Sequence, residues 1–193
     1  APAIGLITAV SGMLATGGSA VVMRKMGEGK GEEACQDFTL LILTNVLVGA
    51  VMMLLGYTQM DRLLGTMGLS PQVFGFCRDY LGNYLIFTIP ILLMYNFSLY
   101  LIAADRPKLS LICTVAGGVT NILLDYFLIA VLDLGIRGAA IATGLGYSIT
   151  AVAGFLVFCQ GKNLLHFQRP VFRFGVLFHA SANGLSELAT ALV

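Results

Sequence analysis

Long apolar stretches separated by short polar links set the pattern of this sequence. Five stretches are almost free of charged residues: 2–23, 38–59, 80–104, 109–132 and 138–159. A sixth begins near Phe174 and continues to Val193. A helix needs about 20 mainly apolar residues to cross the hydrocarbon core of a membrane. The pattern therefore predicts an all-α fold, a polytopic transmembrane bundle with five complete spanning helices and the start of a sixth.

The polar links hold nearly all of the charged residues, and their basic residues are unevenly distributed. The links cover residues 24–37, 60–79, 105–108, 133–137 and 160–173. The first, third and fifth links contain Arg24, Lys25, Lys30, Arg106, Lys108, Lys162, Arg169 and Arg173, whereas the other two contain only Arg62, Arg78 and Arg137. Basic residues favour the cytoplasmic side of a membrane. We therefore expect the first, third and fifth links to be cytoplasmic.

The composition agrees with a membrane protein and excludes several other classes. Hydrophobic residues make up 58% of the 193 residues and charged residues 11%, whereas an ordinary soluble domain has about 25% charged residues. A soluble enzyme domain, a disordered tail and a disulfide-rich secreted module are therefore excluded. The net charge is +1 without a basic patch, which argues against nucleic acid as a partner. The partner that the composition indicates is the lipid bilayer.

The sequence contains no catalytic or cofactor-binding motif. Neither G-x-S-x-G nor H-E-x-x-H occurs, and the glycine-rich segment 27–31 lacks the Lys-Ser/Thr ending of a phosphate loop. The four cysteines (Cys35, Cys77, Cys113 and Cys159) form no C-x-x-C pair, and we interpret them as small buried apolar side chains. We expect no enzymatic activity and no cofactor.

Small residues, a proline and the chain ends carry further expectations. Glycines such as Gly17 and Gly18 in the first stretch, and Gly144 and Gly146 in the fifth, predict closely packed helices. Pro90 cannot donate a backbone hydrogen bond, so we expect the third helix to bend there. The chain has no initiator Met, and it ends within an apolar run. We therefore expect it to be a fragment of a longer protein.

Asp125 is the strongest candidate for a functional residue. It lies near the middle of the fourth apolar stretch, where a carboxylate costs at least ~2.5 kcal/mol on insertion scales. Asn121 lies one helical turn earlier, on the same face. A carboxyl group beside an amide suits a proton or a hard cation held by oxygen ligands. The alternative is that Asp125 is a packing residue that forms hydrogen bonds with a neighbouring helix.

Other polar side chains within the apolar stretches are weaker candidates. Thr143 can cap its own helix or donate across a helix interface. Glu187 is expected to lie within the membrane, in the incomplete sixth helix. Tyr84, Thr88 and Tyr95 fall on roughly one face of the third helix. They would line either a substrate cavity or a seam of hydrogen bonds between helices.

Four segments resemble motifs of the bacterial multidrug and toxic compound extrusion (MATE) transporters, in order and over essentially the whole chain. Residues 17–34 resemble the second helix and first cytoplasmic loop of that family. Asn121 and Asp125 match the N-x-x-x-D motif of its fifth helix, and residues 135–143 match the G-x-x-G-A-A-I-A-T entry to its sixth helix. Residues 183–187 are similar to the start of its seventh helix.

The resemblance implies a larger architecture than the chain contains. Members of this family have twelve helices in two six-helix lobes around a central cavity. Residues 1–173 would then form the first lobe without its first helix, together with a cytoplasmic link, and residues 174–193 would start the second lobe. The chain would lie in the cell (inner) membrane as a multi-pass protein, and the family suggests a monomer.

The resemblance also implies a function and a set of site residues. Family members export small cationic, amphipathic drug-like compounds in exchange for H⁺ or Na⁺. Their first-lobe ion site combines an Asp of helix one with residues that correspond to Asn121, Asp125 and Thr143, and Na⁺ would bind there. Glu187 matches an acid that serves the second lobe. The alternatives are a lipid-linked oligosaccharide flippase of the same superfamily, which needs basic residues for a pyrophosphate headgroup, and a membrane scaffold without transport activity.

Overall fold

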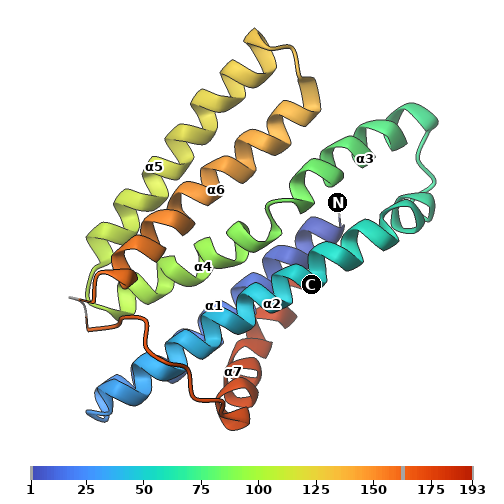
Figure 1. Cartoon of the computed structure of the whole chain (residues 1–193). Helices are drawn as coiled ribbons and strands as arrows, with labels where there is room; N and C mark the ends of the chain where they lie inside the picture. Colours follow the sequence, from blue (N-terminus) through green and yellow to red (C-terminus); the bar gives the residue numbers. More distant parts are fainter. Residues whose placement is uncertain (1, 162–163, 193) are drawn as a thin grey trace.

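The computed structural model describes residues 2–161 and 164–192, with side-chain surroundings given for residues 3–161 and 164–185. Every regular element in this part of the chain is a helix, and it contains no strands (Figure 1). The helices are α1 (Pro2–Gly27), α2 (Gly31–Gly65), α3 (Pro71–Leu85), α4 (Thr88–Ala103), α5 (Pro107–Asp125), the π-helical η1 (Tyr126–Val131), α6 (Gly135–Cys159) and α7 (Phe174–Leu192). The all-α prediction is confirmed.

Within the described residues, four helical segments are long and apolar enough to cross a membrane, by length and composition. They are Ala3–Gly27, Gly31–Gly65, Pro107–Val131 and Gly135–Cys159. Helices α3 and α4 form a fifth span if the bent pair counts as one. These segments correspond to the five complete apolar stretches of the sequence, so the predicted helix bundle is confirmed.

Several helices extend beyond the apolar stretches that predicted them. Only residues 28–30 lie outside helices in the first polar link, and only residues 66–70 do so in the second. The turns contain Gly29 and Gly68 with φ of +76° and +61°, a conformation that glycine adopts at low cost. An apolar stretch indicates the part of a helix that contacts lipid. The helix itself can extend beyond that part into water, until a turn residue ends it.

The bend expected in the third span lies one turn before Pro90. Helices α3 and α4 meet at 56°, and the break falls at residues 86–87. Proline at position 90 removes the hydrogen bond to the carbonyl of Ile86, and its ring crowds that carbonyl. The prediction of a bend is confirmed, and its position follows from the reach of the helical hydrogen bond.

The links alternate between the two ends of the bundle. Those after α1, α4 and α6 lie at one end, and those after α2 and α5 lie at the other (Figure 1). Helix α1 contacts α2, α4 and α7, while α6 packs against α3, α4 and α5. One buried cluster is centred on Phe38, whose ring contacts the rings of Tyr100, Phe158 and Phe167 at centroid distances of 4.9, 4.9 and 5.1 Å.

Glycines bring helix backbones into contact at two crossings. A Cβ atom on Gly17 of α1 would overlap the carbonyl of Ala180 in α7, and one on Gly184 would overlap the carbonyl of Met13. At the α5–α6 crossing, a Cβ on Gly117 would lie 2.7 Å from the carbonyl oxygen of Gly146. The expectation that small residues allow close helix packing is confirmed at these positions.

Candidate ion-coupling site

The α5–α6 crossing positions the first two candidate residues. A Cβ on Gly146 would lie 2.8 Å from the carbonyl oxygen of Gly117 and 3.0 Å from the Cβ of Asn121. The absence of a side chain at Gly146 therefore lets Asn121 lie directly against α6. Asn121 Nδ2 donates a hydrogen bond of 3.4 Å to Thr143 Oγ1. The structure thus brings Asn121 and Thr143 together from two helices.

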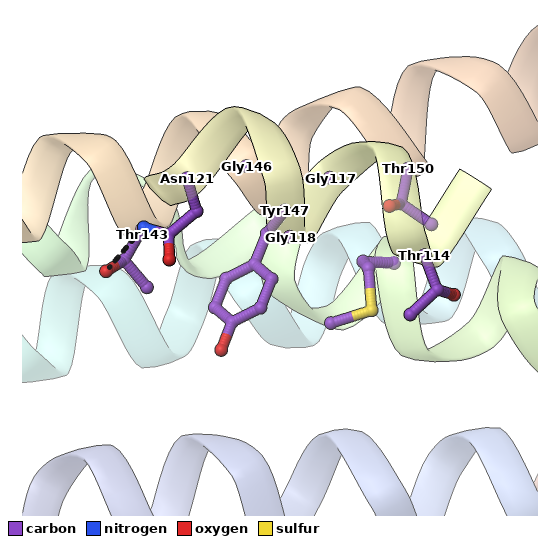
Figure 2. A pocket seen from close by; sticks show the side chains of 9 residues that line it. Thr114, Gly117, Gly118, Asn121, Thr143, Gly146, Tyr147 and Thr150 are labelled. Carbon is purple, nitrogen blue, oxygen red and sulfur yellow. Dashed lines mark hydrogen bonds between the residues drawn. The ribbon is translucent and has the colours of Figure 1, made fainter. Parts of the chain in front are cut away.

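A cavity of about 180 Å³ opens beside this pair (Figure 2). Residues of α4, α5 and α6 line it: Met94, Thr114, Gly117, Gly118, Asn121, Thr143, Gly146, Tyr147 and Thr150. Liquid water occupies about 30 Å³ per molecule, so the cavity has room for several waters or a partly hydrated cation. It is too small for a drug-sized ligand, since such pockets measure about 300–1,000 Å³.

The threonine hydroxyls around the cavity are arranged as hydrogen-bond acceptors. Thr143 Oγ1 donates to the carbonyl of Ala139 at 2.9 Å, Thr114 Oγ1 to that of Ser110 at 2.9 Å, and Thr150 Oγ1 to that of Cys113 at 3.0 Å. Each hydroxyl has one proton, and here a backbone carbonyl receives it. The remaining lone pairs can accept hydrogen bonds or coordinate a hard cation.

Asp125 lies one turn beyond Asn121, at the junction between α5 and η1. Its side chain is half-buried, and its Oδ1 atom is buried without a hydrogen-bond partner among the described residues. The described residues that line the cavity do not include Asp125. A buried carboxylate oxygen without a partner costs free energy that a bound proton or cation would relieve.

The π-helix that begins directly after Asp125 was not predicted. It covers Tyr126–Val131, and the amide of Leu132 donates to the carbonyl of Phe127, five residues earlier. Insertions of this kind are rare and occur frequently at functional sites. The apolar segment from 126 to 131 contains no proline or glycine that signals the change. Sequence periodicity alone therefore could not have located it.

The tyrosine and threonine candidates of the third span are not among the described residues that line this cavity, although Tyr147, which does line it, packs against the same hydrophobic cluster as Tyr95. Tyr84 is buried, and Thr88 is buried with its hydroxyl donating to the carbonyl of Leu85 at 2.8 Å. Tyr84 belongs to a hydrophobic cluster against which Tyr95 packs. Their assignment to a substrate cavity stays a prediction. The side chain of Glu187 lies outside the described residues, although its backbone is part of α7.

Sequence reasoning missed four side chains that line the cavity: Met94, Thr114, Tyr147 and Thr150. A signal for two of them was present. Tyr147 and Thr150 follow Thr143 at i+4 and i+7, so all three lie on one face of α6. Extending that face from Thr143 would have found them. Met94 belongs to another helix, and its approach depends on how α4 packs.

The described residues contain no group of three or more His, Cys, Asp or Glu side chains that could hold a metal ion. A cation at this site would therefore depend on neutral oxygens of Asn121 and Thr143 around the single carboxylate of Asp125. Ligand sets rich in neutral oxygens suit hard cations such as Na⁺ better than transition metals, which prefer nitrogen and sulfur.

Comparison with known proteins identifies the family. The MatE family model matches residues 2–127. The multidrug export protein MepA of Staphylococcus haemolyticus (strain JCSC1435) is 22% identical over 162 residues, which are 84% of this chain and 36% of that protein. The chain thus spans about a third of the length of this curated relative.

Solved structures share the fold. An inward-facing multidrug resistance MATE family transporter of the MOP superfamily superposes with a TM-score of 0.91 at 21% identity, over 99% of this chain and 45% of the other. An outward-facing conformation of such a transporter gives 0.92 at 21% identity, over 99% and 43%. These relatives are transporters and not enzymes. The chain belongs to the MatE family of membrane transporters.

Proposed function

We propose that the protein containing this chain is a secondary exporter of small cationic, amphipathic compounds, driven by the entry of H⁺ or Na⁺. The observation that carries the proposal is the pairing of Asn121 with Thr143 beside a cavity lined by acceptor oxygens, one turn from the unpartnered Oδ1 of Asp125. The name of the relative from Staphylococcus haemolyticus, a multidrug export protein, supports drug export as the activity.

The coupling follows from unequal ion affinity in two conformations. A ligand shifts a conformational equilibrium only by its differential affinity for the two states. An Asp125 carboxylate that is desolvated in one state and hydrated in the other binds a proton or cation more tightly in the first. Ion binding would thereby stabilise one access state, and release would return the transporter to the other. Glu187 is proposed as a second acid with the same role in the second lobe.

Proton and sodium coupling require different residues. A proton needs only the carboxyl group of Asp125. Sodium prefers several oxygen ligands, which Asn121, Asp125 and Thr143 would provide together. Thr143→Val keeps the shape of the side chain but removes its oxygen, so it separates the two cases. No cofactor takes part in either scheme.

A lipid-linked oligosaccharide flippase is the alternative within the same superfamily. Recognition of its pyrophosphate headgroup needs Arg or Lys side chains. The five complete apolar stretches of the sequence contain neither Arg nor Lys, which argues against such a headgroup. A scaffold without transport activity would leave the cost of placing Asp125 within the span uncompensated.

The proposed location is the cell membrane, with the links after α1, α4 and α6 in the cytoplasm. These links lie at one end of the bundle and carry most of the basic residues (Figure 1). Cysteines introduced into these links should react with membrane-impermeant thiol reagents only from the cytoplasmic side. The proposed oligomeric state is a monomer.

Dye efflux from vesicles tests the proposed function. The whole protein is reconstituted, a proton or sodium gradient is imposed separately, and wild type is compared with Asp125→Asn. Asp133→Asn is the matched control, because Asp133 is an exposed acid in the α5–α6 turn with a φ of +54°, which Asn tolerates well. We expect gradient-driven efflux in wild type and Asp133→Asn, and none in Asp125→Asn. Undiminished efflux in Asp125→Asn would contradict the proposal.

A further inference from the structure

The link between α6 and α7 is docked against the first turns of α2. Leu165 is fully buried, and the Phe167 ring lies 5.1 Å from the Phe38 ring. The amide of Gln168 donates to Thr39 Oγ1 at 3.0 Å, and Cys35 Sγ donates to the carbonyl of Leu164 at 3.5 Å. Residues 164–168 of the polar link thus form a packed strap over this segment.

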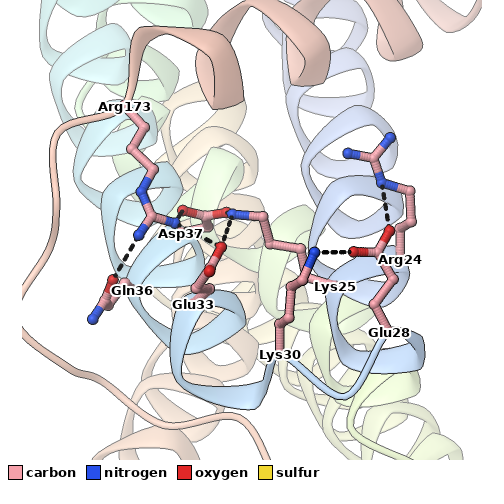
Figure 3. A network of polar contacts seen from close by, with 8 residues as sticks. All are labelled: Arg24, Lys25, Glu28, Lys30, Glu33, Gln36, Asp37 and Arg173. Atoms are coloured by element: carbon pink, nitrogen blue, oxygen red, sulfur yellow. Dashed lines mark hydrogen bonds and ion pairs between the residues drawn. The ribbon is translucent and has the colours of Figure 1, made fainter.

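A network of ion pairs secures the end of this strap (Figure 3). The side chain of Asp37 in α2 is fully buried, and it lies 2.5 Å from Lys25 Nζ of α1 and 3.5 Å from Arg173 Nη1. Glu33 lies 3.1 Å from both cations, and Gln36 Oε1 accepts from Arg173 at 3.3 Å. Three segments of the chain therefore meet around one buried carboxylate.

The burial of Asp37 makes this network expensive to open. A buried charge stays ionised only when it is paired, and removing one partner is strongly destabilising. Separating Arg173 from Asp37 would leave the carboxylate with Lys25 as its one cationic partner among the described residues. The neighbouring pairs of Glu28 with Arg24 and Lys30 are solvent-exposed and carry no such cost.

The first half of α7 is part of the same hydrophobic core. Val176 and Ala180 are buried in one cluster with Val21, Phe38 and Leu165. The glycine contacts of α1 with α7, described above, add direct backbone packing over the same segment. From residue 164 to 184 the chain is therefore bound to α1 and α2 by charge, by hydrogen bonds and by apolar packing.

The arrangement also fits both access states of the fold. The chain, including α7, superposes equally well on the inward-facing and outward-facing transporters, with TM-scores of 0.91 and 0.92 over 99% of its length.

We propose that residues 164–184 form a permanent clamp, fixed to α1 and α2 through Arg173, Lys25 and Asp37, and that they move with the first lobe throughout transport. The pivot between the lobes then lies beyond residue 184, within or after α7, and not in the polar link at 160–173. The proposal rests on the proposed transport function, because it concerns which part of a two-state transporter moves.

Cross-linking the clamp tests this directly. In the whole protein with the four native cysteines replaced, Gln36→Cys and Arg173→Cys are joined by a short bifunctional thiol reagent. The control joins Asp61→Cys to Arg78→Cys. In wild type these residues form an exposed ion pair between α2 and α3 of the same lobe, with 2.9 Å between Arg78 Nε and Asp61 Oδ1. We expect gradient-driven dye efflux to continue at the uncross-linked rate in both. Efflux lost only in the clamp pair, and restored by cleaving the linker, would overturn the proposal.

Labelling of Cys35 tests the clamp independently of transport. Cys35 is buried under the strap, whereas Cys159 is exposed. In protein that retains only Cys35, we expect maleimide labelling to stay slow, relative to protein that retains only Cys159, under every imposed gradient. Arg173→Gln should accelerate it at least about tenfold, because lost charge-assisted hydrogen bonds no longer oppose local opening.

Arg169→Gln is the labelling control, because Arg169 is exposed and forms no ion pair within the described part of the chain. It should leave Cys35 labelling unchanged. Labelling in the parent that is as fast as at Cys159, or that changes with the gradient, would overturn the clamp. If efflux is absent but Cys35 stays protected, the proposed function fails while the clamp stands.

Discussion

Gly146 of α6 lies so close to Asn121 of α5 that a Cβ atom at position 146 would be 3.0 Å from the Asn121 Cβ and 2.8 Å from the Gly117 carbonyl oxygen. The spacing between two helices thus determines whether Asn121 reaches Thr143. The candidate site is therefore sensitive to mutations that add volume at the crossing, even where they remove no polar group.

Comparing Gly117→Ala with Gly118→Ala should distinguish the effect of added volume at the α5–α6 crossing from the effect of helix propensity. A Cβ on Gly117 would meet Gly146, whereas one on Gly118 would meet nothing within 4 Å. Overpacking costs about 1–3 kcal/mol, while Gly→Ala in an open helical position gains about 0.5–1 kcal/mol. We expect thermal unfolding of the whole protein in detergent to show a lower Tm for Gly117→Ala and an equal or higher Tm for Gly118→Ala. Equal losses in both variants would contradict the crossing argument.

Thr143→Val should distinguish sodium from proton coupling with little cost in stability. Hydrogen bonds between membrane helices are worth about 0.6 kcal/mol on average, so the fold should persist. We expect sodium-driven dye efflux to fall strongly and proton-driven efflux to stay near wild type. Thr114→Val controls for the loss of a cavity hydroxyl that is not paired with Asn121. Equal loss of sodium-driven and proton-driven efflux in Thr143→Val would show that Thr143 supports the fold and does not select the ion.

Asn45 of α2 and Asn96 of α4 form a buried reciprocal pair. Asn45 Nδ2 donates to Asn96 Oδ1 at 3.2 Å, and Asn96 Nδ2 donates to Asn45 Oδ1 at 2.9 Å. Either Asn→Leu substitution leaves the partner amide partly unsatisfied, at a cost of about 1–3 kcal/mol. We expect the double variant to lose less free energy of unfolding than the two single variants lose in sum. The difference, which is the coupling energy of the pair, should be about 0.5–3 kcal/mol. Thermal unfolding of the four proteins measures this coupling, and strict additivity would contradict it.

The sequence predicted the parts of this fold that depend on local pattern. Apolar stretches located the five spans because lipid exposure requires continuous apolarity. The motif around Asn121 and Thr143 identified two residues that the structure brings into contact. Each apolar stretch and each motif can be recognised from the residues of its own segment, without knowledge of how the helices pack.

What the sequence did not predict depends on contacts between distant segments. The sequence identified residues 160–173 only as a polar link. The ion pairs of Arg173 with α2 and the burial of Leu165 arise only when α1, α2 and α6 converge. The cavity wall at Met94 likewise depends on the path of α4. The π-helix after Asp125 has no local signal among its apolar residues.

The central claim is that dye export and ion entry are one coupled process at Asp125. The most direct test records dye efflux and ion influx simultaneously, in vesicles that contain the whole protein. The account predicts that correctly oriented transporters move dye out of the vesicle only while H⁺ or Na⁺ crosses in the opposite direction. It also predicts that Asp125→Asn abolishes both fluxes together. Dye efflux without opposing ion movement, or coupled fluxes that persist in Asp125→Asn, would contradict it.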